Sequence, residues 1–153
     1  MKHIDIRLSL EVVAPLLDLI RETAGELRAT LAQPPELPEL DEEMRSAWLQ
    51  DLLQSQDIDL RTLLGLFDGE FFHEGVIGLD EENAEPVLRA SAAVRLRLRS
   101  VHLQDLDDDA METGRVEIST LPEPRRKAFM CYLFLATLQE LVIQHLDPGA
   151  RQG

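Results

Sequence analysis

The sequence is poor in the features that mark secreted, membrane-spanning and phosphate-binding proteins. Only one of its 153 residues is cysteine, so no internal disulfide can form, and the apolar surroundings of Cys131 predict a buried thiol rather than a nucleophile. The N-terminal stretch MKHIDIRLSL lacks the apolar core of a secretory signal, and the longest apolar run, 128–138, is too short to span a bilayer. No glycine-rich phosphate loop, serine elbow or paired-cysteine motif occurs. We therefore expect a soluble cytoplasmic protein with no membrane contact, no cofactor and no enzymatic activity.

Basic residues are scarce in the middle of the chain. Residues 31–88 contain fifteen acidic side chains and only two arginines, a net charge of −13 out of −14 for the whole chain. Such a field repels phosphate backbones and argues against nucleic-acid binding. A solvated acidic face explains this segment most simply, and an acidic surface for a basic protein partner is the functional alternative. The candidate residues for that surface are Glu42, Glu43, Asp51 and Asp57.

The length of the chain and its apolar content of 44% are typical of one globular domain with a single core. Hydrophobic periodicity predicts a mainly α fold, in which four principal helices pack as a bundle with one or two short β-strands. We expect the helical domain to span residues 1–147, followed by a short C-terminal tail at 148–153. A homo-oligomer is compatible with this fold, and the sequence does not identify a protein partner.

The N-terminal half predicts two helices joined by a stiff connector. Alternating apolar residues at 3–10 indicate a strand, and apolar steps of three and four predict a helix from Ser9 or Glu11 to about residue 31. The prolines within 33–40 cannot continue that helix. Asp41 is a candidate N-cap for the next helix. We expect that helix to continue unbroken through the polar segment 55–59 to about residue 68, because its apolar stripe, with Gln56 as a polar step, keeps its register across that segment.

The C-terminal half predicts a second strand and two more helices. Residues 75–79 follow a glycine-marked turn and indicate a strand, and Asp80 is a candidate N-cap for a helix to about residue 106. An acidic loop at 107–124, with an extended piece at 115–119, precedes a last helix over about 124–146.

The stretch VRLRLR at 94–99 alternates apolar and basic residues, as a strand with a basic face would. The longer pattern favours a helix, because apolar and small residues recur there at steps of three and four. These positions are Val87, Ser91, Val94, Leu98 and Val101. Since Leu96 and Leu103 lie on the opposite side, we expect a central helix wedged between neighbours.

Arg95 and Arg99 are predicted to form structural ion pairs on the flanks of that helix, because a partly buried guanidinium requires a partner. For Arg95 we expect a carboxylate from the acid-rich helix at 41–68. Breaking that buried pair predicts a loss of about 2–4 kcal/mol for Arg95→Ala. The more exposed flank of Arg97 predicts well under about 1 kcal/mol for Arg97→Ala.

The alternative function is that of a metal-dependent helical-bundle enzyme using Glu70 and His73. Their i, i+3 spacing is the one with which di-iron bundles direct two ligands at one metal. Such sites need a second Glu-x-x-His motif, which the sequence lacks, and the glycines around GEFFHEG indicate a turn. The acidic stretch DLDDDA at 105–110 fails as a calcium loop, because Ala110 and Val116 stand where glycine and glutamate are required.

Three stretches carry a resemblance to a known family. They are DEEMRSAWLQDLLQSQDIDLRTLLGLFDG at 41–69, AAVRLRLRS at 92–100 and YLFLATLQELV at 132–142. Together they resemble a small bacterial family labelled domain of unknown function 2017, over about residues 41–146. The family usually has an asparagine–aspartate pair where Ala92 and Ala93 stand, and a glycine where Arg99 stands. A function of that polar pair in the family does not transfer to this chain.

The resemblance implies no known activity. Members of the family in actinobacteria often lie beside the gene for the adaptor of the Clp protease, which suggests a link to regulated proteolysis. The sequence and the resemblance together predict a non-catalytic protein-interaction or regulatory module.

Overall fold

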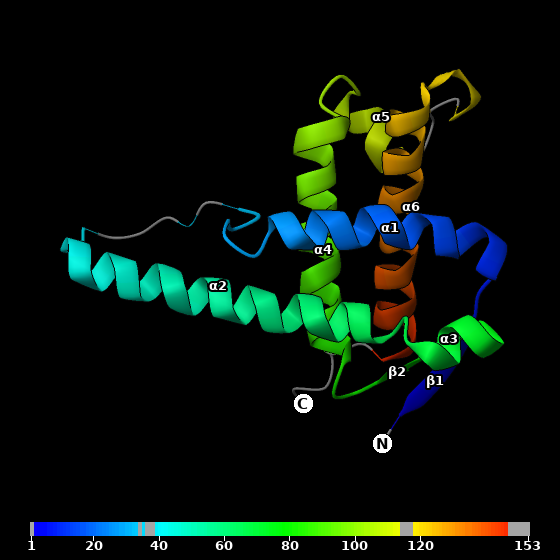
Figure 1. Cartoon of the computed structure of the whole chain (residues 1–153), viewed down its shortest axis with the longest axis horizontal. Helices are drawn as coiled ribbons and strands as arrows, with labels where there is room; N and C mark the ends of the chain where they lie inside the picture. The colour runs from blue at the N-terminus through cyan, green and yellow to red at the C-terminus, as the bar shows by residue number, and fades with distance from the viewer. Residues whose placement is uncertain (1, 34, 36–38, 114–117, 147–153) are drawn as a thin grey trace.

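The computed structural model describes residues 2–33, 35, 39–113 and 118–146 (Figure 1). The four long helices are α1 (Leu10–Glu26), α2 (Glu42–Gly65), α4 (Ala84–His102) and α6 (Glu123–His145). The shorter elements are β1 (His3–Arg7), α3 (Gly69–Glu74), β2 (Val76–Asp80), α5 (Asp108–Thr113) and the 3₁₀-helix η1 (Ile118–Thr120). The predicted fold class, mainly α with four principal helices and short strands, is confirmed.

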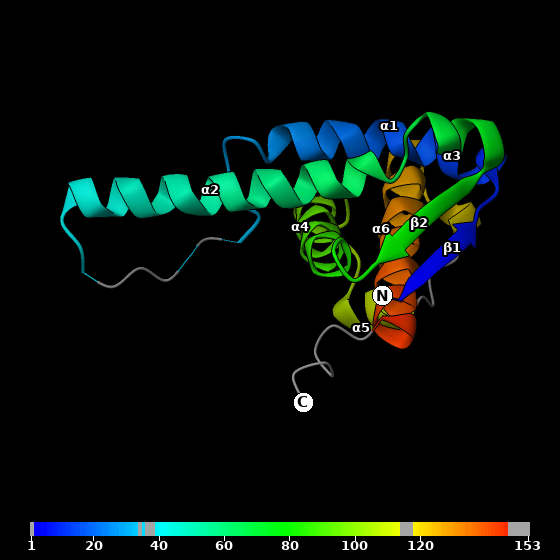
Figure 2. The same ribbon diagram turned by 90° about the horizontal axis from the view of Figure 1, so that it is seen from below.

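The four long helices form two layers that cross each other. α1 and α2 run in opposite directions in one layer, and α4 and α6 run in opposite directions in the other (Figure 1 and Figure 2). α4 packs against both α2 and α6, while α1 crosses α4 and α6. The core lies between the layers and contains fully buried side chains from each of them, among them Leu17, Leu63, Leu98 and Phe129.

The two strands pair antiparallel beside α3, in a register that places His3 opposite Asp80 and Arg7 opposite Val76. α3 is followed by its C-cap residue Gly75, which adopts a left-handed conformation with φ of 72°. The Gly75 N–H donates to the carbonyl of Phe71, and its own carbonyl accepts from the N–H of Leu8, both at 2.7 Å. Gly75 therefore joins the end of α3 to the connection between β1 and α1.

Most helix boundaries follow the predicted signals. α2 begins after Asp41, whose carboxylate accepts from the Met44 N–H at 2.8 Å, and it continues unbroken through 55–59. Asp80 is not the N-cap of α4; it ends β2, and its carboxylate accepts from the N–H groups of Glu82 and Asn83 in the turn that follows. α1 ends at Glu26, before the predicted residue 31, and α4 ends at His102, before the predicted 106. The tail at 148–153 and residues 115–117 lie outside the described residues. The extended piece predicted at 115–119 is wrong at Ile118 and Ser119, which belong to η1, and the loop predicted at 107–124 contains α5.

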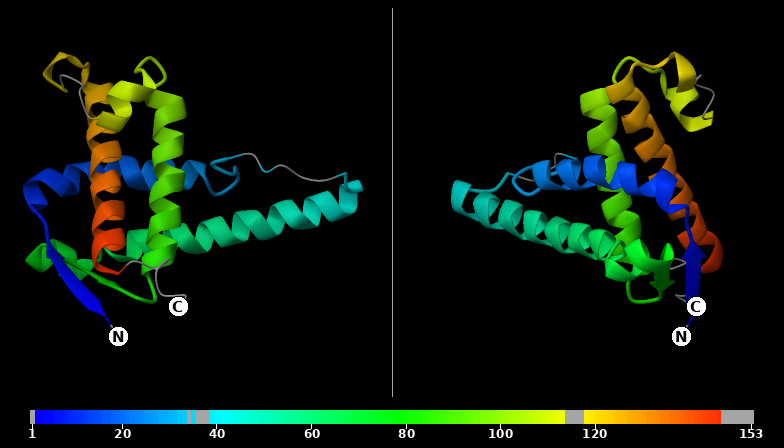
Figure 3. Two further views of the ribbon diagram at one scale, coloured as in Figure 1. Left: turned by 180° about the vertical axis from the view of Figure 1, so that it is seen from behind. Right: turned by 45° about the vertical axis from the view of Figure 1, so that its right-hand side comes forward.

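The N-terminal part of α2 projects from the body of the protein (Figure 1 and Figure 3). No residue of 42–58 is buried, and the buried residues of α2 are Asp59, Leu60 and Leu63. We call residues 42–58 the arm; as a helix it is about 25 Å long. The apolar stripe predicted along this helix therefore reaches the core only in its last two turns.

Among the described residues, α6 is the one helix whose length and mean hydropathy of 1.2 would allow it to cross a membrane. One side of α6 is buried against α4 and α1, through residues that include Phe129, Leu135 and Val142. A central position in the core accounts for this apolar composition.

Candidate interaction site

Three connected hollows follow the arm and one side of α4. The first has a volume of about 340 Å³ and lies on the arm. The second, of about 470 Å³, shares Leu52 and Ser55 with the first and lies between α2, α4 and the segment after α1. The third, of about 360 Å³, shares Ala92 and Leu96 with the second and extends along α4 to α6. We call the three hollows together the groove.

Large apolar side chains are exposed along the groove. Met44 is 56% exposed, and Trp48 and Leu96 are each 46% exposed. Met44, Trp48 and Leu52 follow one another at four-residue intervals, so they share one face of α2. The expectation that α4 is wedged between neighbours on both sides is wrong at Leu96, where the groove is open, although Leu103 is fully buried. A contiguous apolar surface of this kind marks an interaction site more often than isolated exposed residues do.

Acidic side chains lie beside the apolar face of the arm. Asp51 stands three residues after Trp48 and lines the first hollow with it, whereas Glu43 lines none of the three hollows. Of the four acidic residues predicted to form an interaction surface, Asp57 pairs with Arg61 at 2.9 Å. The other three, Glu42, Glu43 and Asp51, are exposed and form no ion pair with a described residue.

Gln56 secures the base of the arm. The Gln56 amide donates to the carbonyls of Leu27 and Thr30 and accepts from the N–H of Ala32, at distances from 2.7 to 3.1 Å. Gln56 therefore ties the segment after α1 to α2, which explains a polar residue in the middle of an apolar stripe.

An ion pair joins α2 to α4 at the same place. Asp59, which is 8% exposed, accepts two hydrogen bonds from Arg89, at 2.9 Å from Nε and at 3.0 Å from Nη2. The hydrogen bond to Asp59 and the charge of that carboxylate raise the pKa of the Arg89 guanidinium. The two residues are thirty positions apart, and no local sequence signal indicates that they pair.

Arg95 has neutral partners, so the carboxylate predicted for it is wrong. Its Nη1 donates to Gln139 Oε1 at 2.5 Å, and its guanidinium lies over the ring of Tyr132, 4.4 Å from the centroid. Both partners belong to α6, and no carboxylate of α2 pairs with Arg95. The ion pair predicted for Arg99 stays a prediction; this side chain lines the third hollow together with Arg95 and Tyr132.

We expect Arg95→Ala to destabilise the protein by about 1–2 kcal/mol, which is less than a stranded carboxylate would cost. Arg97 pairs instead with Glu26 of α1 at 3.2 Å, and both side chains are about one-third exposed. Arg97→Ala should therefore cost less than about 1 kcal/mol. Urea unfolding of the two variants measures the difference, and a larger loss for Arg97→Ala would contradict these assignments.

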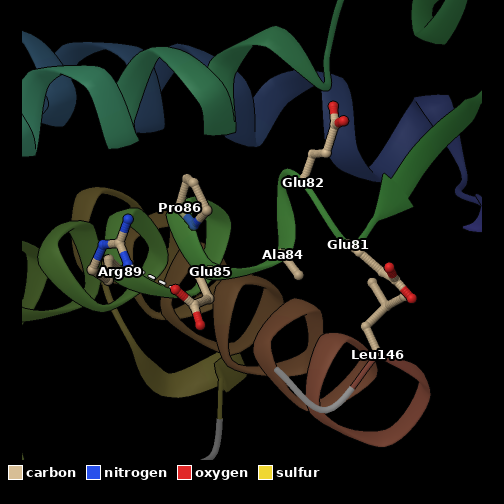
Figure 4. Close-up of a pocket in the computed structure, with 7 residues that line it drawn as sticks. All are labelled: Glu81, Glu82, Ala84, Glu85, Pro86, Arg89 and Leu146. Carbon is tan, nitrogen blue, oxygen red and sulfur yellow. Dashed lines mark hydrogen bonds and ion pairs between the residues drawn. The ribbon is translucent and has the colours of Figure 1, made fainter. Parts of the chain in front are cut away.

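A separate hollow of about 340 Å³ lies where α4 begins (Figure 4). Glu81, Glu82 and Glu85 line it, and their carboxylates point in different directions. Two of them have partners, because Glu81 accepts from the Lys2 N–H at 3.1 Å and Glu85 lies 3.5 Å from Arg89. No group of three or more metal-ligating side chains occurs within the described part of the chain.

Glu70 and His73 lie in a helix, not in the turn that the flanking glycines indicate. α3 runs from Gly69 to Glu74 and is capped by Asp68, whose carboxylate accepts from the N–H groups of Glu70 and Phe71. Both candidate ligands are exposed on this short helix. The described residues bring no third metal-ligating side chain to Glu70 and His73.

Cys131 is fully buried in α6, and its thiol donates to the carbonyl of Leu16 at 3.5 Å. Burial raises the pKa of this thiol from 9.0 to about 12. Because the thiolate is the reactive form, Cys131 is suited to packing and not to nucleophilic chemistry.

The raised pKa of Cys131 predicts a loss of stability at alkaline pH. Below pH 9 the thiol is protonated in both states, whereas between pH 9 and about 12 only the unfolded state ionises. The free energy of unfolding should therefore fall by about 1.4 kcal/mol per pH unit in that window. Urea unfolding at pH 7 and pH 10.5 should show an extra loss of about 2 kcal/mol in the wild type compared with Cys131→Ala. Equal losses in both proteins would contradict the assignment.

The comparison with known families decides what kind of chain this is. A family model described as Domain of unknown function (DUF2017) matches residues 13–146. The chain belongs to the DUF2017 family. The match begins within α1, whereas the resemblance seen in the sequence of this DUF2017 protein begins at about residue 41. No curated protein and no solved structure matches the chain.

Proposed function

We propose that this DUF2017 protein is a non-catalytic protein-interaction module of the bacterial cytoplasm, and that the arm is the part that binds a partner. The observation that supports the proposal is the arm itself. It is most of a 24-residue helix, it contains no buried residue, and it holds the exposed Met44 and Trp48 on one face. Packing within the chain does not account for two large apolar side chains on a projecting helix, whereas a protein partner that covers them does.

The family association suggests the setting in which such a partner acts. Genes for DUF2017 members in actinobacteria often lie beside the gene for the adaptor of the Clp protease. We propose that the module takes part in regulated proteolysis by holding a component or a substrate of that system, with no chemistry of its own.

The arm can be tested by comparing two double variants. Met44→Ala/Trp48→Ala removes the exposed apolar face of the arm, and Val12→Ala/Ile143→Ala removes two side chains that are 53% and 52% exposed outside the groove. Partners captured from a bacterial lysate by the wild-type protein are identified, purified and titrated against both variants. We expect binding to be lost in the arm variant and kept in the control.

The outcomes separate the arm from the proteolytic setting. Equal binding by both double variants would contradict the arm as the binding surface. A partner that depends on the arm but is unconnected with proteolysis would contradict only the link to Clp. Because the arm contributes no buried residue, both variants should melt within about 2 °C of the wild type.

A further inference from the structure

We infer that the groove binds an amphipathic helix with a basic flank, supplied by another protein. This inference rests on the proposed function and names the chemistry of the partner. Its first basis is shape, because the hollows share lining residues and follow one another from the arm to α4. The arm is about 25 Å long, which is the length of a helix of about 17 residues.

The second basis is the apolar lining. Met44, Trp48 and Leu52 line the first hollow, and Leu96 lines the two hollows that follow it. Small side chains, Ala92 and Ala93 of α4, leave room between these larger ones. An amphipathic helix presents its apolar side chains at steps of three and four residues, which is the spacing of the row on the arm.

The third basis is charge. The arm contains four acidic residues and one arginine, and the whole chain has a net charge of −14. Asp51 lines the first hollow together with the apolar row, so lysine or arginine beside the apolar face of a bound helix would meet it, and Glu43 adds negative charge to the same part of the arm. A second copy of this chain would bring its own −14 to the contact, and that repulsion favours a basic partner over self-association.

The end of the groove at α4 limits where the basic side chains of the partner helix can lie. Arg95 and Arg99 line the third hollow, and Arg95 has no carboxylate partner among the described residues. The positive charge of Arg95 disfavours lysine at this end. The basic side chains of the partner therefore belong along the arm, and the contact with α4 is apolar, centred on Leu96.

The single tryptophan of the chain is a built-in probe of this site. Trp48 lines the first hollow and is 46% exposed, so a helix that covers it should shift its emission to shorter wavelength. The test uses three capped 18-residue peptides: an amphipathic leucine/lysine helix, the same helix with glutamate for each lysine, and a serine/lysine peptide of the same charge. We expect saturable binding and a blue shift with the leucine/lysine peptide alone.

Two charge-reversal variants locate the binding site. Glu43→Lys/Asp51→Lys should weaken the leucine/lysine peptide by about tenfold or more. The control Asp18→Lys/Glu22→Lys changes the net charge by the same amount on the exposed side of α1, away from the groove, and should weaken binding less than about twofold. Both variants alter exposed residues, and circular dichroism verifies that each is folded.

Several results would overturn the inference. Equal affinity for the leucine/lysine and serine/lysine peptides would show that binding depends on charge alone and not on the apolar face of the peptide. Equal affinity for the leucine/lysine and leucine/glutamate peptides would show that the site does not require basic side chains in its partner. Equal weakening by the two charge reversals would place the peptide outside the groove. A blue shift that grows with protein concentration in the absence of peptide, together with a dimer mass in sedimentation, would make a second copy the occupant. If the peptides fail while a lysate partner still requires Met44 and Trp48, the proposed function stands and only the chemistry of the partner is wrong.

Discussion

Arg89→Ala should destabilise the protein by about 2–3 kcal/mol, because it strands a buried carboxylate. Asp59 is 8% exposed and accepts two hydrogen bonds from Arg89, at 2.9 and 3.0 Å. Without the guanidinium, the Asp59 carboxylate loses both donors at the contact between α2 and α4. The Arg89 side chain itself is 58% exposed, so water reaches the site in part, and the expected loss lies below the about 3–5 kcal/mol of a fully buried pair.

The ion pair between Asp57 and Arg61 is the matched control. It has the same distance of 2.9 Å, but the Arg61 side chain is 78% exposed. Arg61→Ala should therefore cost less than about 0.5 kcal/mol. Urea unfolding at pH 7 compares the two variants, and equal losses would show that the burial of Asp59 has no energetic effect.

A rescue experiment tests the mechanism of that loss. In the Arg89→Ala background, Asp59→Asn removes the stranded charge and keeps the size of the side chain. We expect this second change to recover about 1 kcal/mol, because a neutral amide costs less to bury than a carboxylate does. A further loss on adding Asp59→Asn would mean that the carboxylate has other partners.

Gly75→Ala should cost about 2–3 kcal/mol, because two effects add at this residue. Gly75 has φ of 72°, a conformation that a residue with a Cβ adopts only with strain. A Cβ built there would also lie 2.9 Å from the carbonyl oxygen of Leu8. That carbonyl belongs to the backbone, and the N–H of Leu8 donates to the Gly75 carbonyl at 2.7 Å. Neither Leu8 nor residue 75 can therefore move away without losing this hydrogen bond.

Gly25→Ala is the opposite case and serves as its control. Gly25 lies near the end of α1, and a Cβ there would have no neighbour within 4 Å. Alanine should therefore stabilise the protein by about 0.5–1 kcal/mol, since glycine is the poorer helix former. Thermal melts should show shifts of opposite sign, and a stabilising Gly75→Ala would contradict the left-handed conformation.

The helices and strands follow from local patterns in the sequence. The continuous register of apolar residues predicts that α2 runs through the polar segment 55–59, and it does. The strand predicted at 75–79 is β2 at Val76–Asp80, because alternation and a glycine turn are signals within a few residues. The acidic candidates Glu42, Glu43 and Asp51 are likewise recognisable in the sequence, and the structure places them on the arm.

The partners of individual side chains could not be predicted in the same way. The partial burial of the Arg95 guanidinium correctly predicts that this side chain has a partner. The partners are Gln139 and Tyr132 of α6, and not a carboxylate of α2. The ion pair between Asp59 and Arg89 joins α2 to α4, and no pattern of neighbouring residues in the sequence predicts that these two helices are in contact.

The sequence by itself determined where this chain forms helices, where its strands lie and how its charge is distributed, because these properties depend on neighbours a few residues apart. Periodicity identifies which residues share a face of a helix, but it does not tell whether another helix covers that face. Only the tertiary structure decided that α2 reaches the core only in its last two turns, that Leu96 faces an open groove, and that Met44 and Trp48 are exposed. The physical reason is that burial depends on how the two helical layers cross, and residues distant in the sequence set that crossing together.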